Sequence, residues 1–402
     1  MNLIIKKPSL NDNGNKTRME SEIVVENETK HIWLEADARY KEYMTYEVSD
    51  AFFVMLYPFA AVNGYDVISE IPISETLYYN FTRYINKILS DNHKILHSIS
   101  VECESIDFHC PSTNCVGVGF SCGVDSFCSA IRNMDDRFPH FKLTHLCTFN
   151  AGAMGPDGEK DHIYFEQKCQ AVKEVANEMG LDYLFIDTNY YDFYDSIIWT
   201  RYYNIIHSGI VLAFQKLFDK YYFGSDYTLD EFNVKKIYDD TIKDFLFYKF
   251  SNKNIKIYCD SEDLSRIEKT EIIADSHSAQ THLSVCGYGH NNCSQCEKCT
   301  RTMTTLKIMN KLDSFDSVFD VELFNKKYKK ALARYYARKG FVSYANEIHK
   351  YYKKMQGHYP IQVYFYAPFY FITGLIKKIL DPYKGKLVRL RKLYREHLKK
   401  YM

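Results

Sequence analysis

The chain has 402 residues, which exceeds the usual size of one domain and predicts two domains or one domain with large additions. Hydrophobic residues make up 46% of it and charged residues 25%, a balance that excludes a largely disordered protein. The 51 Lys and Arg equal the 51 Asp and Glu in number, which excludes a uniformly basic nucleic-acid coat. The charge is uneven, because residues 377–400, here called the basic tail, hold ten Lys or Arg against two acidic residues, a net +8.

The first 110 residues are predicted to form a small α+β unit. Residues 1–20 are polar and predict a loose terminus. Beyond them, alternating residues predict strands, and apolar residues at a period of 3.6 predict helices. The expected elements are a hairpin over 22–34, a helix over 49–63, a strand at 66–68, a helix from 74 onward and a strand over 95–101.

From residue 115 onward, short apolar strands alternate with helices, and this pattern predicts a doubly wound parallel sheet of the α/β class with right-handed crossovers. The expected strands lie at 116–120, 143–149, 183–187, 221–224 and 255–258, and the expected helices follow residue 123 and lie at 161–179 and 202–219. Residues 310–355 are predicted to be helical. We therefore divide the chain into an N-terminal unit (1–110), a core (111–310) and a helical, basic C-terminal extension (311–402).

The turn after the first core strand has the composition of an anion site. Small residues, two hydroxyl groups and the N-terminus of a helix occur together there, and free N–H groups with the helix dipole attract phosphate. The turn is neither a Walker loop nor a dinucleotide fingerprint, because the lysine and the glycine spacing are missing. Asp125 would repel phosphate unless a cation bridges the two, which implies Mg²⁺. An ordinary capped turn is the alternative.

The segment Ser121-Cys122-Gly123-Val124-Asp125-Ser126 also resembles the Ser-Gly-Gly-x-Asp-Ser pyrophosphate loop (PP-loop) of the N-type ATP pyrophosphatases. The resemblance implies that these six residues bind the phosphates of ATP and that the substrate is adenylated. Cys122 replaces the first glycine of that motif. Its thiol is either a tolerated small side chain or a catalytic group, and the sequence leaves both open.

Four cysteines, Cys286, Cys293, Cys296 and Cys299, follow the pattern Cys-x6-Cys-x2-Cys-x2-Cys. Two-residue gaps let successive thiolates converge on one tetrahedral ion, so this pattern predicts a zinc site, with an iron–sulfur cluster as the alternative. Because protein fills all four positions, the zinc is expected to be structural. His290 lies within the span and is an alternative ligand.

A pyrophosphate loop followed by this cysteine cluster is similar to the 7-cyano-7-deazaguanine synthase family, over about residues 115–306. The resemblance implies an adenine nucleotide α-hydrolase-like (HUP-type) fold and an ATP-dependent ligase. Such an enzyme adenylates a deazaguanine-like carboxylate, releases AMP and pyrophosphate, and uses ammonia or an amine as nucleophile. It also assigns site residues. Asp125, Lys269 and Arg301 are expected to be catalytic, and Asn150 and Gly224, at strand ends, are expected to contact the nucleotide.

Longer members of this family imply a phage-defence or conjugation role, so a protein acceptor and a homodimer are left open. Two rivals remain: ATP-dependent modification of a tRNA base, with RNA held by the basic tail, and a non-catalytic scaffold that docks a partner. The N-terminus lacks a signal-peptide pattern, which favours a cytoplasmic protein. No membrane span is expected, since the longest apolar run, 361–376, is too short.

Overall fold

A computed structural model of the chain describes residues 1–26, 28–151, 159–194, 196–226, 228–229, 246–287, 289 and 291–376. His290 and the basic tail lie outside the described residues. The chain divides into two compact units. Unit 1 comprises Met1–Ser265, Asp275–Val285 and Gly289–Asn291, and unit 2 comprises Arg266–Ala274, Cys286–Tyr288 and Asn292–Met402.

Unit 1 is built on a mixed eleven-stranded sheet, which confirms the predicted α/β class. Its strands are β1 (Asn2–Ile5), β2 (Ser9–Asn13), β3 (Lys16–Val25), β4 (Glu28–Asp37), β5 (Asp66–Ser69), β7 (Val101–Glu102), β9 (Cys115–Gly119), β10 (His145–Phe149), β11 (Asp182–Thr188), β12 (Phe218–Gly224) and β13 (Lys256–Asp260). They are hydrogen-bonded in the order β13-β12-β9-β10-β11-β4-β3-β1-β5-β7, and β2 pairs with β3. Two short strands, β6 (Ile73–Ser74) and β8 (Ser105–Ile106), form a separate pair.

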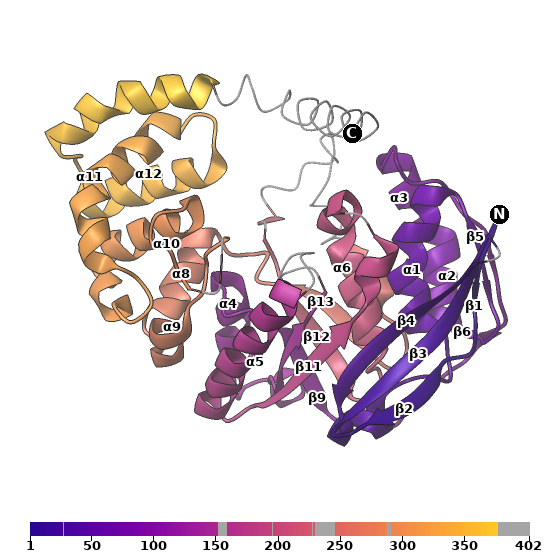
Figure 1. Cartoon of the computed structure of the whole chain (residues 1–402). Helices are drawn as coiled ribbons and strands as arrows, with labels where there is room; N and C mark the ends of the chain where they lie inside the picture. Colours follow the sequence, from indigo (N-terminus) through magenta and orange to yellow (C-terminus); the bar gives the residue numbers. More distant parts are fainter. Residues whose placement is uncertain are drawn as a thin grey trace, which may run out of the picture. The chain divides into compact units, whose positions relative to one another are not determined.

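The five strands from β13 to β11 run parallel, with the first of them in the chain, β9, in the middle. Three helices connect or follow them: α4 (Val124–Arg132), α5 (Glu159–Met179) and α6 (Ser196–Leu212). Figure 1 shows α4 and α5 on one side of these strands and α6 on the other. Right-handed crossovers that leave a central strand in opposite directions produce this arrangement. The predicted parallel sheet thus accounts for five of the eleven strands.

The other half of the sheet comes from the N-terminus, and here the prediction of a loose terminus over 1–20 is wrong. β1 pairs with β3 and β5, and β2 pairs with β3. Met19 and Ile23 on β3 and Leu3 on β1 are fully buried, so apolar residues among polar ones anchor the segment. β4 continues into the parallel half through an antiparallel pairing with β11. No division between the two units therefore falls near residue 110.

Helix α1 (Asp50–Asn63) forms where predicted and packs on α6 (Figure 1). Gly64 ends it in the left-handed conformation. Close packing requires Gly209 on α6, because a Cβ at that position would lie 2.6 Å from the Met55 side chain and 2.7 Å from the Ala51 carbonyl. The predicted helix from residue 74 continues through α2 (Glu75–Asn80), a π-helical turn (Phe81–Ile85) and α3 (Asn86–Asn92).

Two further predictions are wrong in extent. The edge strand β7 has only two residues, Val101 and Glu102. Val101 is therefore the one residue of the predicted strand 95–101 that pairs in the sheet. The predicted helix over 202–219 ends at Leu212, and residues from Phe218 onward belong to β12. The second error arises because the apolar residues continue from α6 into β12, where helix and strand periods cannot be told apart.

A buried polar network joins distant parts of unit 1. The Asp50 carboxylate accepts hydrogen bonds from the Ser74 N–H (2.8 Å) and hydroxyl (2.6 Å), and from the amide groups of Gln215 (3.3 Å) and Asn252 (3.1 Å). Asp50 is fully buried, and a buried carboxylate is tolerated only when donors satisfy it. The network fixes α1 against strand β6 and against the segments that precede β12 and β13.

Unit 2 is helical. Its helices are α8 (Arg266–Ala274), α10 (Glu297–Ile308), α11 (Val321–Arg338) and α12 (Ser343–Gln356), and residues 361–376 are also helical. The predicted helical region 310–355 is thus broken near Gly340, where Val342 adopts an extended conformation before α12. Among the described residues, none of the helices is long and apolar enough to cross a membrane.

Candidate functional site

The predicted phosphate-binding turn connects β9 to α4. β9 lies between β10 and β12, and the helices that lead to these neighbours, α4 and α6, lie on opposite sides of the parallel strands (Figure 1). In open α/β sheets, ligands bind outside the carboxyl ends of the strands at the place where the helices change sides. The turn therefore occupies the position at which such a sheet takes a ligand.

The backbone carbonyls of the turn are held by other parts of unit 1. The Phe120 carbonyl accepts a hydrogen bond from the Thr148 hydroxyl (2.7 Å), and the Ser121 carbonyl accepts one from the Lys168 ammonium group (3.0 Å). The Cys122 carbonyl accepts from the Ser284 N–H (2.8 Å), and the Gly123 carbonyl accepts from the Ser126 hydroxyl (3.1 Å). Because the carbonyls are engaged within the protein, they do not face a ligand with negative partial charge. The N-terminus of α4 and its dipole remain as the electrostatic signature of the turn.

Ser126 shapes the turn from within. Its hydroxyl oxygen accepts hydrogen bonds from the N–H groups of Gly123 (3.0 Å) and Ser121 (3.3 Å), and the side chain is only 6% exposed. It is therefore a positioning residue in this structure, and the predicted contact of Ser126 with phosphate stays a prediction.

The six predicted loop residues alternate in exposure. Ser121 is exposed and Gly123 and Asp125 are half-buried, whereas the side chains of Cys122, Val124 and Ser126 are buried. Only the odd-numbered positions thus present atoms to a ligand. This alternation separates residues that can contact a phosphate from residues that hold the turn in shape.

Cys122 adopts a left-handed backbone conformation, with φ of 58°. This region favours glycine and costs another residue about 1–2 kcal/mol, so the backbone at Cys122 has the conformation expected of the glycine it replaces. Its side chain is fully buried, and burial raises the pKa of the thiol to about 11. A thiol in this state is a poor nucleophile, which argues against the catalytic alternative.

Lys168 is a residue that the sequence analysis missed. It lies on α5, is 3% exposed, and donates to the turn at Ser121. Burial lowers the pKa of its ammonium group. The sequence contains a signal for Lys168. It comes three residues after Phe165 and four before Val172, so it is a lone charge on the apolar face of the predicted helix.

Gly224, at the end of β12, lies against the start of α4. A Cβ at this position would lie 3.2 Å from the carbonyl carbon and oxygen of Asp125. Such a contact is tighter than ordinary van der Waals packing, so any side chain here pushes on the turn. Gly224 thus lies beside the first turn of α4, and its predicted contact with the nucleotide stays a prediction.

Asn150 and Asp187 meet at the carboxyl ends of neighbouring strands, β10 and β11. The Asn150 amide donates to the Asp187 carboxylate (2.8 Å), and its carbonyl oxygen accepts from the Tyr191 hydroxyl (3.4 Å). The ring of His162 lies 3.4 Å from the same carboxylate. Asn150 is 1% exposed, so its first role is to hold Asp187, and its predicted nucleotide contact stays a prediction.

The other two residues predicted to be catalytic belong to unit 2. Lys269 lies on α8 and is 2% exposed. Arg301 lies on α10, and its guanidinium group is 5.2 Å from the centre of the Tyr344 ring on α12. Their catalytic roles stay predictions, since they rest on the resemblance alone.

The four predicted metal ligands, Cys286, Cys293, Cys296 and Cys299, come together in unit 2. Their sulfur atoms all lie within 4.8 Å of one another. Zinc–sulfur bonds of about 2.3 Å in a tetrahedron require sulfur atoms about 3.8 Å apart, so the group is able to hold such an ion. The predicted metal set is thereby assembled, and the donor chemistry fits zinc.

Backbone geometry builds this cluster. Ser294 has a φ of 56° and turns the chain between Cys293 and Cys296. The Cys293 sulfur accepts from the Cys296 N–H (3.3 Å), and the Cys296 sulfur accepts from the Cys299 N–H (3.4 Å). Burial tends to raise the pKa of Cys293, but hydrogen bonds from the N–H groups of Gln295 and Cys296 and from the neighbouring cysteine side chains together outweigh it and lower the pKa to about 7, which favours the metal-binding thiolate.

Asn292 supports the cluster from outside, and the sequence analysis did not single it out. Its carbonyl oxygen accepts from the Cys286 N–H (3.2 Å), and its amide donates to the Val318 carbonyl (3.1 Å). It thus joins the separate first cysteine to the loop before α11. Such outer contacts commonly orient the ligands of a metal site.

Comparisons with family models, curated proteins and solved structures found no match to this chain.

Proposed function

We propose that the protein is an ATP-dependent ligase of the PP-loop type, similar to the 7-cyano-7-deazaguanine synthases. It activates a carboxylate by adenylation and passes the acyl group to ammonia or an amine. The observation that carries the proposal is the turn after β9, which combines the Ser-x-Gly-x-Asp-Ser sequence, engaged carbonyls and a helix N-terminus at the switch point of five parallel strands.

Different residues of the turn would bind the phosphates and the Mg²⁺ ion. The N-terminus of α4 stabilises the negative charge of the phosphates, and the Ser121 hydroxyl is exposed beside it. Asp125, half-buried in the first turn of α4, is the residue that would hold Mg²⁺. The cation would neutralise the charge that Asp125 otherwise sets against the phosphates.

The reaction balances without a redox partner. A carboxylate oxygen of the substrate attacks the α-phosphorus of ATP, the bond between the α-phosphorus and the bridging oxygen breaks, and pyrophosphate leaves. The lone pair of ammonia or an amine then attacks the acyl carbon, AMP leaves with the carboxylate oxygen, and a proton is released. The protein contributes position and charge, and no covalent bond to Cys122 is needed.

The cysteine cluster is assigned to structural zinc. Protein donors fill all four positions of a tetrahedral ion, and a closed site leaves no position for substrate. The ion would tie Cys286 to the start of α10, where Cys296 is the N-cap residue. This role makes zinc part of the stability of unit 2.

Calorimetric titration with ATP tests the nucleotide site. We expect binding that requires Mg²⁺ and that weakens at least tenfold in Gly224→Val, because the new side chain pushes the Asp125 backbone. Gly340→Val is the matched control, since a Cβ there meets nothing within 4 Å. Absence of ATP binding in the wild type, or equal binding in Gly224→Val, would contradict the proposal.

A further inference from the structure

Residues 361–376 form the last described helix of unit 2, and they contain no charged residue. One narrow side of the helix, at Val363, Ala367 and Gly374, is buried. Phe341 packs there, with its ring 3.1 Å from the position of a Cβ on Gly374. This side attaches the helix to the rest of unit 2.

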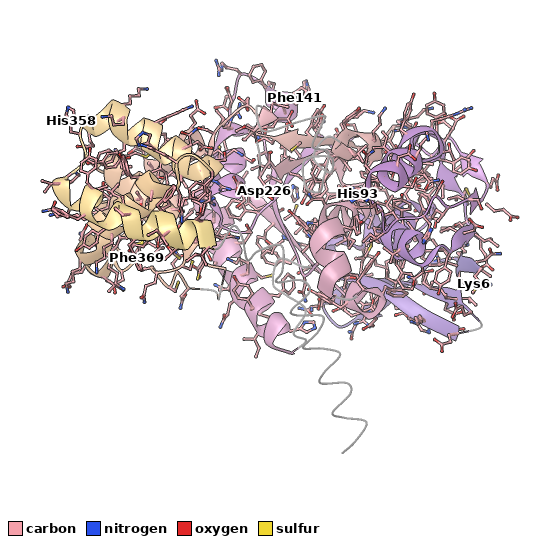
Figure 2. All side chains as sticks on the ribbon, turned by 90° about the horizontal axis from the view of Figure 1, so that it is seen from above. Lys6, His93, Phe141, Asp226, His358 and Phe369 are labelled. Carbon is pink, nitrogen blue, oxygen red and sulfur yellow. The ribbon has the colours of Figure 1, made fainter. Side chains whose placement is uncertain are left out.

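The opposite side is apolar and exposed. Five residues spaced by four, four, three and four positions lie on one line along the helix, here called the apolar stripe. They are Ile361 (66% exposed), Phe365 (76%), Phe369 (65%), Ile372 (57%) and Ile376 (50%). Figure 2 labels Phe369 beside this helix. Single exposed apolar residues are normal, but a continuous stripe marks an interaction surface.

Positive charge lies beside the same helix. The Lys330 ammonium group lies 5.6 Å from the centre of the Tyr366 ring, and Lys339 lies 3.9 Å from that of Tyr336, which packs on Tyr364. The basic tail, with its net charge of +8, begins at the residue after the stripe. Aromatic and aliphatic residues flanked by Lys and Arg are the composition of helices that lie in a membrane interface.

We propose that the helix 361–376 and the basic tail bind the surface of an anionic lipid bilayer. The apolar stripe inserts at the boundary between headgroups and acyl chains, and the basic residues attract the anionic headgroups. A single apolar or charged signal gives weak attachment, whereas the two together give stable attachment. We expect the helix to lie in the plane of the surface, because the uncharged run that precedes Lys377 and Lys378 has 16 residues and as a helix spans only about 24 Å, less than a bilayer core of about 30 Å.

The charge also argues against a second copy of this chain as the occupant. Two copies that pair through their apolar stripes carry a combined tail charge of about +16, and like charges disfavour such an interface. A bilayer with anionic lipids removes this repulsion and covers the stripe at the same time.

The test is co-sedimentation of the full chain with vesicles. Phosphatidylcholine vesicles with about 30% phosphatidylserine are compared with phosphatidylcholine alone, at low and high salt. We expect binding to the anionic vesicles, weakened at least tenfold by high salt and by the double variant Phe365→Glu/Phe369→Glu. Phe138→Glu is the matched control, since Phe138 is 57% exposed in unit 1.

A second full-length variant, with Gln at Arg389, Arg391, Lys392 and Arg395, tests the charge alone without touching the packed helix. It should also bind at least tenfold less. Circular dichroism and thermal unfolding verify that the variants are folded. The proposal is overturned if the wild type does not bind anionic vesicles, or if the folded variant Phe365→Glu/Phe369→Glu binds them as strongly as the wild type. It is also overturned if sedimentation without lipid shows a dimer that this variant dissolves. Failure here would leave ATP binding in place, and so would not bear on the proposed ligase activity.

Discussion

The ammonium group of Lys168 donates a hydrogen bond to the backbone carbonyl of Ser121, with 3.0 Å between the two atoms. This contact joins the middle of α5 to the candidate phosphate loop. Because Lys168 is almost fully buried, the loop and the lysine hold each other in place. The carbonyl of an exposed residue is thereby fixed by a buried cation.

Replacing Lys168 with Met should loosen the loop. The Ser121 carbonyl loses its partner, and we expect a loss of about 1 kcal/mol in the free energy of unfolding and roughly tenfold weaker binding of Mg²⁺–ATP. Lys173→Met, on the exposed side of the same helix, is the control and should leave both unchanged. Urea unfolding and calorimetric titration measure the two effects. An unaltered affinity for ATP would show that the contact does not position the loop.

The pH dependence of the same variant has a defined sign. Burial lowers the pKa of Lys168 in the folded state, so between that value and the unfolded value of 10.5 the unfolded chain binds more protons. The stability of the wild type relative to Lys168→Met should therefore rise with pH in this alkaline window. Unfolding free energies of the two proteins, taken at matched pH values, test this. If the stability difference between the wild type and Lys168→Met falls as the pH rises, the lowered pKa of Lys168 is contradicted.

Cys122 should prove structural. Its buried thiol has a pKa of about 11, so a thiol reagent should modify the folded protein slowly at this position. Cys122→Ala should retain ligase activity within about threefold, and Cys122→Gly should recover part of the roughly 1–2 kcal/mol cost of a left-handed cysteine. Mass mapping of alkylated cysteines and product assays measure these effects. A hundredfold loss of activity in Cys122→Ala would instead mark a catalytic thiol.

The cysteine cluster should contain one zinc ion per chain. Cys296→Ser removes a ligand that also caps α10, so it should lose the metal and several kcal/mol of stability in unit 2. Cys115→Ser, on β9 and outside the cluster, should keep the metal. Elemental analysis of both proteins decides the matter, and a zinc content that does not change in Cys296→Ser would refute the site.

Asp50 should be among the most sensitive positions in unit 1. In Asp50→Asn the new amide faces the donor groups of Gln215 and Asn252, so we expect a loss of about 3 kcal/mol in the free energy of unfolding. Asp91→Asn, exposed on α3, should have little effect. Chemical denaturation compares them. Equal stability of Asp50→Asn and the wild type would mean that Asp50 is already a neutral carboxylic acid, whose hydrogen bonds an amide can reproduce.

Much of the parallel half of the sheet could be predicted from sequence, because its strands and helices are short, apolar and separated by glycine or polar turns. The boundaries of α1 were evident from Ser49 and Gly64. The pairing of β1 with β3 and β5 was not, since strands distant in the chain decide it. The β2–β3 hairpin is local, with Gly14 and Asn15 between the paired Asn13 and Lys16, and this turn signal was missed.

The candidate sites divide in the same way. Local spacing placed all four cysteines, because a short loop is enough to bring them together. Lys168 and Asn292 were missed, since each acts on a backbone group that only the folded chain brings near. Sequence similarity suggested one common role for the loop residues 121–126, whereas burial separates exposed residues such as Ser121 from buried ones such as Ser126.

The identity of the nucleotide products tests the proposed adenylation reaction directly. Purified full-length protein is incubated with Mg²⁺, carboxy-deazaguanine, an ammonium salt and ATP labelled at the α- or γ-phosphate. We expect the α-label in AMP and the γ-label in pyrophosphate, and neither product from Asp125→Asn, whose zinc content should be unchanged. Formation of ADP and free phosphate by the wild type would contradict it.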